Sequence, residues 1–112
     1  MVDDPIYELM RSYLDIPGMQ AAILVSDQGL VVNSAHNGEV DIDTISALVV
    51  DTVAAAQRFG GEAGVGGLDT MTIEFEGMTL LLAPFDHDVM LTLVARPGTF
   101  ALMSELNPAA GC

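Results

Sequence analysis

The most informative pattern of apolar and polar residues lies between residues 19 and 34. Two apolar runs, residues 19–26 and 30–34, are separated by Asp27-Gln28-Gly29. A three-residue loop that ends in Gly predicts a β-hairpin, because Gly adopts the left-handed conformation that the turn needs. In the first run both alternating sets of side chains are largely apolar. The pattern therefore predicts a strand in a sheet that is covered on both faces.

Apolar residues at helical spacing predict three helices, one before the hairpin, one after it and one near the end of the chain. They cover residues 5–15, about 43–59 and 97–106. An aspartate in front of each of the first two helices can cap it. The candidates are Asp3 or Asp4 for the first helix and Asp41 or Asp43 for the second.

Three further strands are predicted after the second helix, over residues 70–76, 78–83 and 89–95. We expect the polar segments 35–41 and 84–88 to be loops. The order is α-β-β-α-β-β-β-α without an internal repeat. It predicts a single α+β domain across residues 1–112, with a core at about 5–106 and a tail at 107–112.

Composition narrows the range of partners and compartments. The chain has 16 acidic residues, three arginines and no lysine, for a net charge of −13, so nucleic acids and anionic membranes would be repelled. Its one cysteine, Cys112, excludes an intrachain disulfide. The acidic N-terminus is unlike a signal peptide, and no apolar run reaches the ~18 residues of a membrane span. These features predict a cytoplasmic protein without membrane insertion.

Candidate catalytic and metal-binding residues are few. The only histidines, His36 and His87, fall in predicted loops. Asp86-His87-Asp88 offers metal-ligand chemistry, but a structural site needs about four ligands and no second cluster completes it. No serine has a nucleophile-elbow context, and Cys112 lies in the predicted tail. We expect no catalytic site, no metal and no cofactor.

A glycine-rich segment follows the second helix, with glycines at positions 60, 61, 64, 66 and 67. We expect Gly60-Gly61 to end the helix and the rest to form a flexible loop. A P-loop requires a lysine, which this chain lacks. A dinucleotide-binding motif requires a strand before the glycines and a helix after them, and here the order is reversed. The segment therefore does not predict nucleotide binding.

The second helix has two faces of interest. The predicted core face contains the apolar residues at helical spacing from Ile45, namely Ile45, Leu48, Val49, Thr52, Val53, Ala56 and Phe59. The opposite side holds Ala47, Val50 and Ala54, flanked by Asp51 and Arg58. Alanine is simply a good helix former, so this stripe is compatible with an ordinary solvated face. It is equally compatible with a surface on which a second helix packs closely.

The strand predicted at residues 70–76 alternates strictly between apolar and polar positions, which is typical of an edge strand. Thr70, Thr72 and Glu74 lie on its polar side. The edge is either kept apart from other strands by charge or pairs with its own copy in a dimer.

Several segments together resemble the Roadblock family, which is named for a dynein light chain and includes small bacterial and archaeal proteins. They are Ile16-Pro17-Gly18-Met19, the hairpin 26–32, the alanine-rich helix 44–59, the strand 72–76 and the apolar pair 79–83 and 90–95. The resemblance spans residues 5–106, and the closing helix is short for the family.

The resemblance implies a five-stranded antiparallel sheet, with the long second helix on one face and the two terminal helices on the other. It also implies a homodimer in which the second helices lie side by side and the third strands join. The expected interface residues are then Ala47, Val50, Asp51, Ala54, Arg58, Thr70, Thr72 and Glu74.

Prokaryotic family members are commonly partners of small Ras-like GTPases, and some promote GTP hydrolysis while others are scaffolds. The resemblance therefore implies a non-enzymatic homodimeric regulator or scaffold that binds such a GTPase. Two alternatives stay open. A small-ligand sensor of profilin-like or PAS-like shape would need an apolar pocket with converging polar groups. An enzyme would need a titratable cluster.

Overall fold

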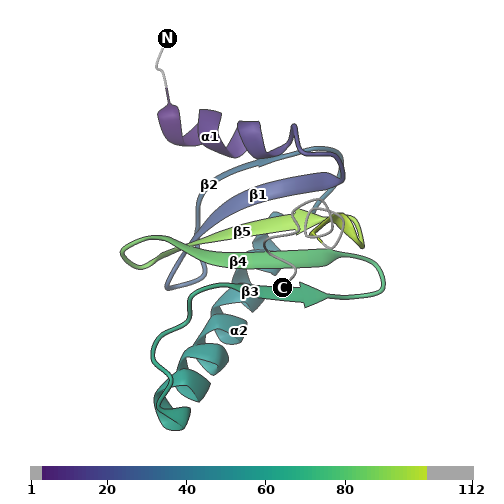
Figure 1. The fold of residues 1–112 in the computed structure, drawn as a ribbon. Coiled ribbons are helices and arrows are strands. Elements are labelled where there is room, and N and C mark those ends of the chain that lie inside the picture. Colours follow the sequence, from purple (N-terminus) through teal and green to yellow (C-terminus); the bar gives the residue numbers. More distant parts are fainter. Residues whose placement is uncertain (1–3, 101–112) are drawn as a thin grey trace, which may run out of the picture.

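The computed structural model describes residues 4–100 of the chain (Figure 1). Its elements are α1 (Pro5–Tyr13), β1 (Met19–Ser26), β2 (Val31–His36), α2 (Ile42–Ala63), β3 (Met71–Glu74), β4 (Thr79–Asp86) and β5 (Val89–Ala95). In this part of the chain the strands form one antiparallel sheet in the order β2-β1-β5-β4-β3. This architecture confirms the predicted α+β fold.

The sheet is buried on both faces around β1, as its sequence predicts. Residues 21–25 are each at most 2% exposed. On one face Ala22 and Leu24 pack with Met10 of α1, and on the other Ala21 and Ile23 pack with Val49 of α2. Burial of this apolar surface, at roughly 25 cal/mol per Å², is the main contribution that holds α1 and α2 on the two faces of the sheet.

The predicted β1–β2 hairpin is confirmed. The N–H of Gly29 donates to the carbonyl of Ser26, and the N–H of Ser26 donates to the carbonyl of Leu30, both at 2.9 Å. Gly29 has φ +82°, a conformation in which a side chain would be strained. The Gly at the end of the loop therefore has the role that the sequence indicates.

Helix α1 is capped by Asp4, one of the two predicted candidates, and ends at Tyr13 rather than at residue 15. The Oδ1 atom of Asp4 accepts hydrogen bonds from the N–H groups of Ile6 and Tyr7, both at 3.1 Å. Its Oδ2 accepts a hydrogen bond from Asn33 Nδ2 of β2 at 3.2 Å. One carboxylate thus caps the helix and joins it to the edge of the sheet.

Helix α2 begins after Asp41, whose side chain accepts from the N–H of Thr44 at 3.2 Å. The prediction that it ends at Gly60-Gly61 is wrong. The left-handed residue that ends it is Gly64, with φ +72°. The N–H of Gly64 donates to Gly61, and the N–H of Val65 donates to Gly60, which is the Schellman pattern. Two glycines cost about 1 kcal/mol each inside a helix, and this does not end it.

Gly60 has a separate role in α2. It is buried, and a Cβ at this position would overlap the carbonyl oxygen of Gly66 in the returning loop. The loop is also held by the N–H of Leu68, which donates to Gln57 Oε1 at 2.8 Å. The glycine-rich segment is therefore a close helix–loop contact as well as a connection.

The turn predicted at residues 84–88 is too long. Strand β4 continues through Pro84 to Asp86, and the connection to β5 is His87-Asp88, with Asp88 at φ +61°. Pro84 fits because β3 pairs with β4 only as far as Leu82, so within residues 4–100 no strand pairs with β4 on that side at Pro84.

Other boundaries differ by a few residues. Strand β2 runs from Val31 to His36, which shortens the loop predicted at 35–41 and places His36 in a strand. Strand β3 covers only Met71–Glu74. The backbone is helical at Thr99 and Phe100, and the remainder of the predicted closing helix lies outside the described residues. Within residues 4–100, no helix combines the length and hydropathy of a membrane span.

Candidate interaction surface

Helix α2 lies against β1 and β2 through a narrow core face. Ser46 and Val49 are buried, and Ile45, Val50 and Val53 are half-buried against the cluster formed by β1 and β5. In Figure 1 the C-terminal part of α2 extends beyond β3. The second half of this helix is therefore covered on fewer sides than the first.

The predicted orientation of α2 is partly wrong. Leu48 and Phe59, placed by the sequence on the core face, are 60% and 70% exposed. Val50, placed on the opposite side, packs on the core, and its Cγ2 lies 3.2 Å from where a Cβ on Gly29 would be. The β1–β2 loop contacts one side of the helix, so the core face is rotated toward Val50 and away from Leu48.

Three sides of α2 remain outside its core face, as follows from a rotation of 100° per residue. The β3 flank carries Leu48, Thr52, Ala55 and Phe59. The hairpin flank carries Val50, Ala54 and Gln57. The outer side carries Ala47, Asp51 and Arg58, all exposed.

The β3 flank borders a hollow of ≈ 540 Å³ over the start of β3. Thr52, Ala55 and Phe59 line it from the helix, Val65 from the glycine-rich loop and Met71 from β3. Further along the same face of the sheet, Ile73 and Leu80 are only half-buried, and their backbones are paired across β3 and β4. The result is an apolar surface that joins the helix to the sheet edge.

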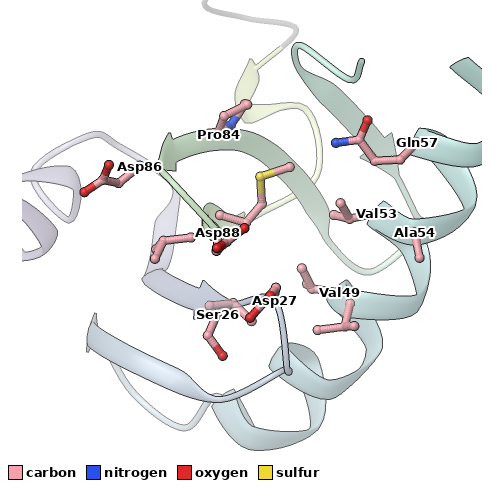
Figure 2. Close-up of a pocket in the computed structure, with 13 residues that line it drawn as sticks. Ser26, Asp27, Val49, Val53, Ala54, Gln57, Pro84, Asp86 and Asp88 are labelled. Carbon is pink, nitrogen blue, oxygen red and sulfur yellow. The ribbon is translucent and has the colours of Figure 1, made fainter. Parts of the chain in front are cut away.

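The hairpin flank borders a different pocket of ≈ 330 Å³, drawn in Figure 2. Val49, Val53 and Ala54 form the helix wall, and the two turns that carry Asp27 and Asp88 form the opposite wall. The N–H of Asp27 donates to the carbonyl of Asp88 at 3.0 Å, which holds these turns side by side.

The residues predicted for an interface are exposed except Val50, which is half-buried. Val50 lies on the hairpin flank, Asp51 and Arg58 lie on the outer side, and Ala47 and Ala54, seven residues apart, share the column where these two sides meet. Thr70, Thr72 and Glu74 are exposed at β3. Thr72 is paired with Leu81, which packs on the α1 side of the sheet, so the Thr72 side chain is on the face away from α2.

The sequence interpretation missed the β3 flank. Its signal is a second apolar column on α2, at positions 48, 52, 55 and 59, beside the column that packs on the sheet. A helix whose apolar arc exceeds one face has more than one packing partner. The predicted core face includes Leu48, Thr52 and Phe59 of this column but not Ala55.

The candidate catalytic and metal-binding residues are exposed or lie outside the described residues. His87 and Asp88 form a solvent-facing pair at 3.6 Å, with side chains 94% and 63% exposed. His36 Nδ1 lies 2.9 Å from the carbonyl oxygen of Gly38. In the described range 4–100, no three His, Cys, Asp or Glu side chains are grouped to hold a metal. Cys112 lies outside the described residues.

Comparison with known proteins extends the sequence resemblance. A protein of Methanocaldococcus jannaschii, MJ0714, is 34% identical over 83 residues, which cover 73% of this chain and 67% of that protein. A second protein of the same organism, MJ0310, is 32% identical over 83 residues, covering 73% and 69%.

Solved structures share the fold at low identity. The gliding protein MglB of Thermus thermophilus aligns with a TM-score of 0.74 at 21% identity, over 86% of this chain and 77% of that one. A Roadblock/LC7 domain from Streptomyces avermitilis gives 0.73 at 20% identity, over 80% and 77%. An MglB structure with a tetrameric arrangement gives 0.75 at 21%, over 98% and 91%. Residues 5–95 match the family model of the Roadblock/LC7 domain, so the chain belongs to the Roadblock/LC7 family.

Proposed function

We propose that this protein is a non-enzymatic regulator or scaffold that acts as a homodimer and binds a small Ras-like GTPase. Family membership supports the proposal, because the prokaryotic Roadblock proteins that the sequence resembles commonly partner such GTPases. The observation that carries the homodimer is the apolar surface formed by the β3 flank of α2 and the adjoining face of β3 and β4. Contiguous exposed apolar surface on a soluble protein marks an interaction site.

The second copy of the chain is the occupant proposed for this surface. Leu48, Ala55 and Phe59 would contact the same residues of the second α2, with the two helices about 8–10 Å apart. Ala55 is exposed and small, so it permits close approach, and Phe59 supplies apolar area next to the hollow at Met71. This assignment replaces the Ala47/Val50/Ala54 stripe as the helix contact.

The edge of β3 completes the proposed dimer. Strand β3 is at the end of the sheet, so one side of its backbone has unpaired N–H and C=O groups. A two-fold axis at Thr72 would pair the strands antiparallel and place Glu74 opposite Thr70 of the second copy. That register avoids the repulsion of two glutamates directly opposite one another.

The outer side of α2 is the surface proposed to contact the GTPase. In the dimer just described, Ala47, Asp51 and Arg58 stay exposed on both helices. The chain's charge of −13 favours a partner with a comparatively basic face. Regulation would then come from how the partner is held, with no catalytic group contributed by this chain.

The test is to use the tagged full-length chain to capture partners from the native lysate. We expect a small GTPase to be recovered. Its single-turnover GTP hydrolysis is then measured alone and with the chain, and a change in rate identifies a regulator while binding at unchanged rate identifies a scaffold. Recovery of no GTPase, or GTP hydrolysis by the chain alone, would contradict the proposal.

A further inference from the structure

The pocket on the hairpin flank of α2 is not used by the proposed dimer. It lies on the side of the helix opposite the β3 flank, so a second copy on that flank leaves it open. Its lining comes from three separate parts of the fold, namely the end of β1 with its turn, α2, and the β4–β5 hairpin (Figure 2).

The pocket combines an apolar interior with carboxylates at its margin. Val49 and Val53 form the wall on α2, and Asp27 and Asp88 lie across from them. Asp86 also lines the margin, and in Figure 2 its carboxylate points away from the centre. None of the lining residues is cationic, and the side chain that lies beside a lining carboxylate is the exposed His87, 3.6 Å from Asp88. The occupant must therefore be partly apolar and positively charged.

The apolar walls of the pocket select among cations. No three acidic or histidine side chains in the described part of the chain are close enough to hold one metal ion. A compact ion would have fewer than three such ligands and would leave the apolar walls without a partner. An arginine side chain has an apolar stem and a planar, delocalised charge that binds carboxylates through several N–H donors. Its chemistry matches both parts of the pocket.

We propose that this pocket receives an arginine side chain from a partner protein, with its stem against Val49 and Val53 and its guanidinium between Asp27 and Asp88. Gln57, whose Oε1 accepts from Leu68, is at the rim and is held in place by that bond. The proposal is independent of the GTPase assignment, since any partner that presents an exposed arginine would serve.

The probe for this proposal is the capped tripeptide Leu-Arg-Leu, with Leu-citrulline-Leu as the neutral control of the same shape. Binding to the isotope-labelled full-length protein is followed by amide chemical shifts. We expect saturable changes confined to the pocket, around residues 26, 27, 53, 57 and 88, with the arginine peptide only. Equal changes with the citrulline peptide, or changes spread over the acidic surface, would overturn the proposal.

Variants separate a built pocket from general acidity. Asp27→Asn and Asp88→Asn should each weaken binding by about tenfold, the size of one charge-assisted hydrogen bond. Asp69→Asn removes the same charge beside the hollow on the β3 flank and should leave binding unchanged. Ala54→Met keeps every carboxylate but fills the helix wall, and it should also weaken binding. Equal losses in the Asp27 and Asp69 variants, or none with Ala54→Met, would contradict the assignment.

Discussion

Gly29 of the β1–β2 loop packs against Val50 of α2, so closely that a Cβ on the glycine would lie 3.2 Å from the valine Cγ2. The same glycine has φ +82° in the hairpin turn. One residue therefore allows the turn and lets the loop reach the helix. The contact lies on the side of α2 opposite the β3 flank, where Leu48 and Phe59 are exposed.

Gly29→Ala should destabilise the protein by two effects. The positive φ costs an L residue roughly 1–2 kcal/mol, and the added methyl group displaces Val50. Gly38→Ala is the matched control, because Gly38 has φ +68° but no atom within 4 Å of the added Cβ. Urea unfolding at one protein concentration should give a larger loss for Gly29→Ala than for Gly38→Ala. Equal losses would show that the contact with Val50 contributes nothing.

Two neighbouring glycines of α2 should respond with opposite signs to substitution by alanine. Gly61 has open space around its Cβ direction, so Gly61→Ala should stabilise the protein by about 0.5–1 kcal/mol through helix propensity. Gly60→Ala should destabilise it, because the methyl group would overlap the carbonyl oxygen of Gly66. Circular dichroism during urea unfolding measures both. Stabilisation by Gly60→Ala would mean that the loop does not pack on the helix end.

Two adjacent alanines distinguish the possible dimer surfaces. At roughly tens of micromolar protein we expect the unmodified chain to be a dimer. Ala55→Arg places a long charged side chain on the β3 flank and should produce monomers at the same concentration. Ala54→Arg places it on the hairpin flank and should leave the dimer intact. Sedimentation equilibrium measures the mass of each. Monomers from Ala54→Arg with dimers from Ala55→Arg would instead favour the Ala47/Val50/Ala54 stripe.

Association with the GTPase should depend on salt and on the outer side of α2. Raising salt from roughly 0.01 to 1 M shortens the Debye length from about 30 to about 3 Å and should slow association by roughly tenfold or more. Asp51→Asn should lower the association rate at low salt and change little at high salt. Surface plasmon resonance measures these rates. An association rate that changes neither with salt nor with Asp51→Asn would show that charge is not the basis of recognition.

The bounds of β1 and β5 follow from the sequence because their residues are apolar at successive positions, which few other elements accommodate. The orientation of α2 does not follow in the same way. Periodicity shows which residues share a column, such as 48, 52, 55 and 59, but not which column meets the sheet. That choice depends on contacts with residues outside the helix, such as the contact of Val50 with Gly29. Similarly, Pro84 indicates a turn until the short β3 is seen to leave its side of β4 unpaired.

The position of β5 between β1 and β4 has a consequence for how the chain folds. The strand made last lies at the centre of the sheet, so its pairing with β1 must close a loop that contains most of the chain. The entropy of that closure is lost before the contacts form, which slows folding. During synthesis, β1 therefore has an unpaired apolar edge until residues 89–95 have left the ribosome. The sheet cannot be completed before β5 is available, so this edge of β1 stays open to aggregation until then.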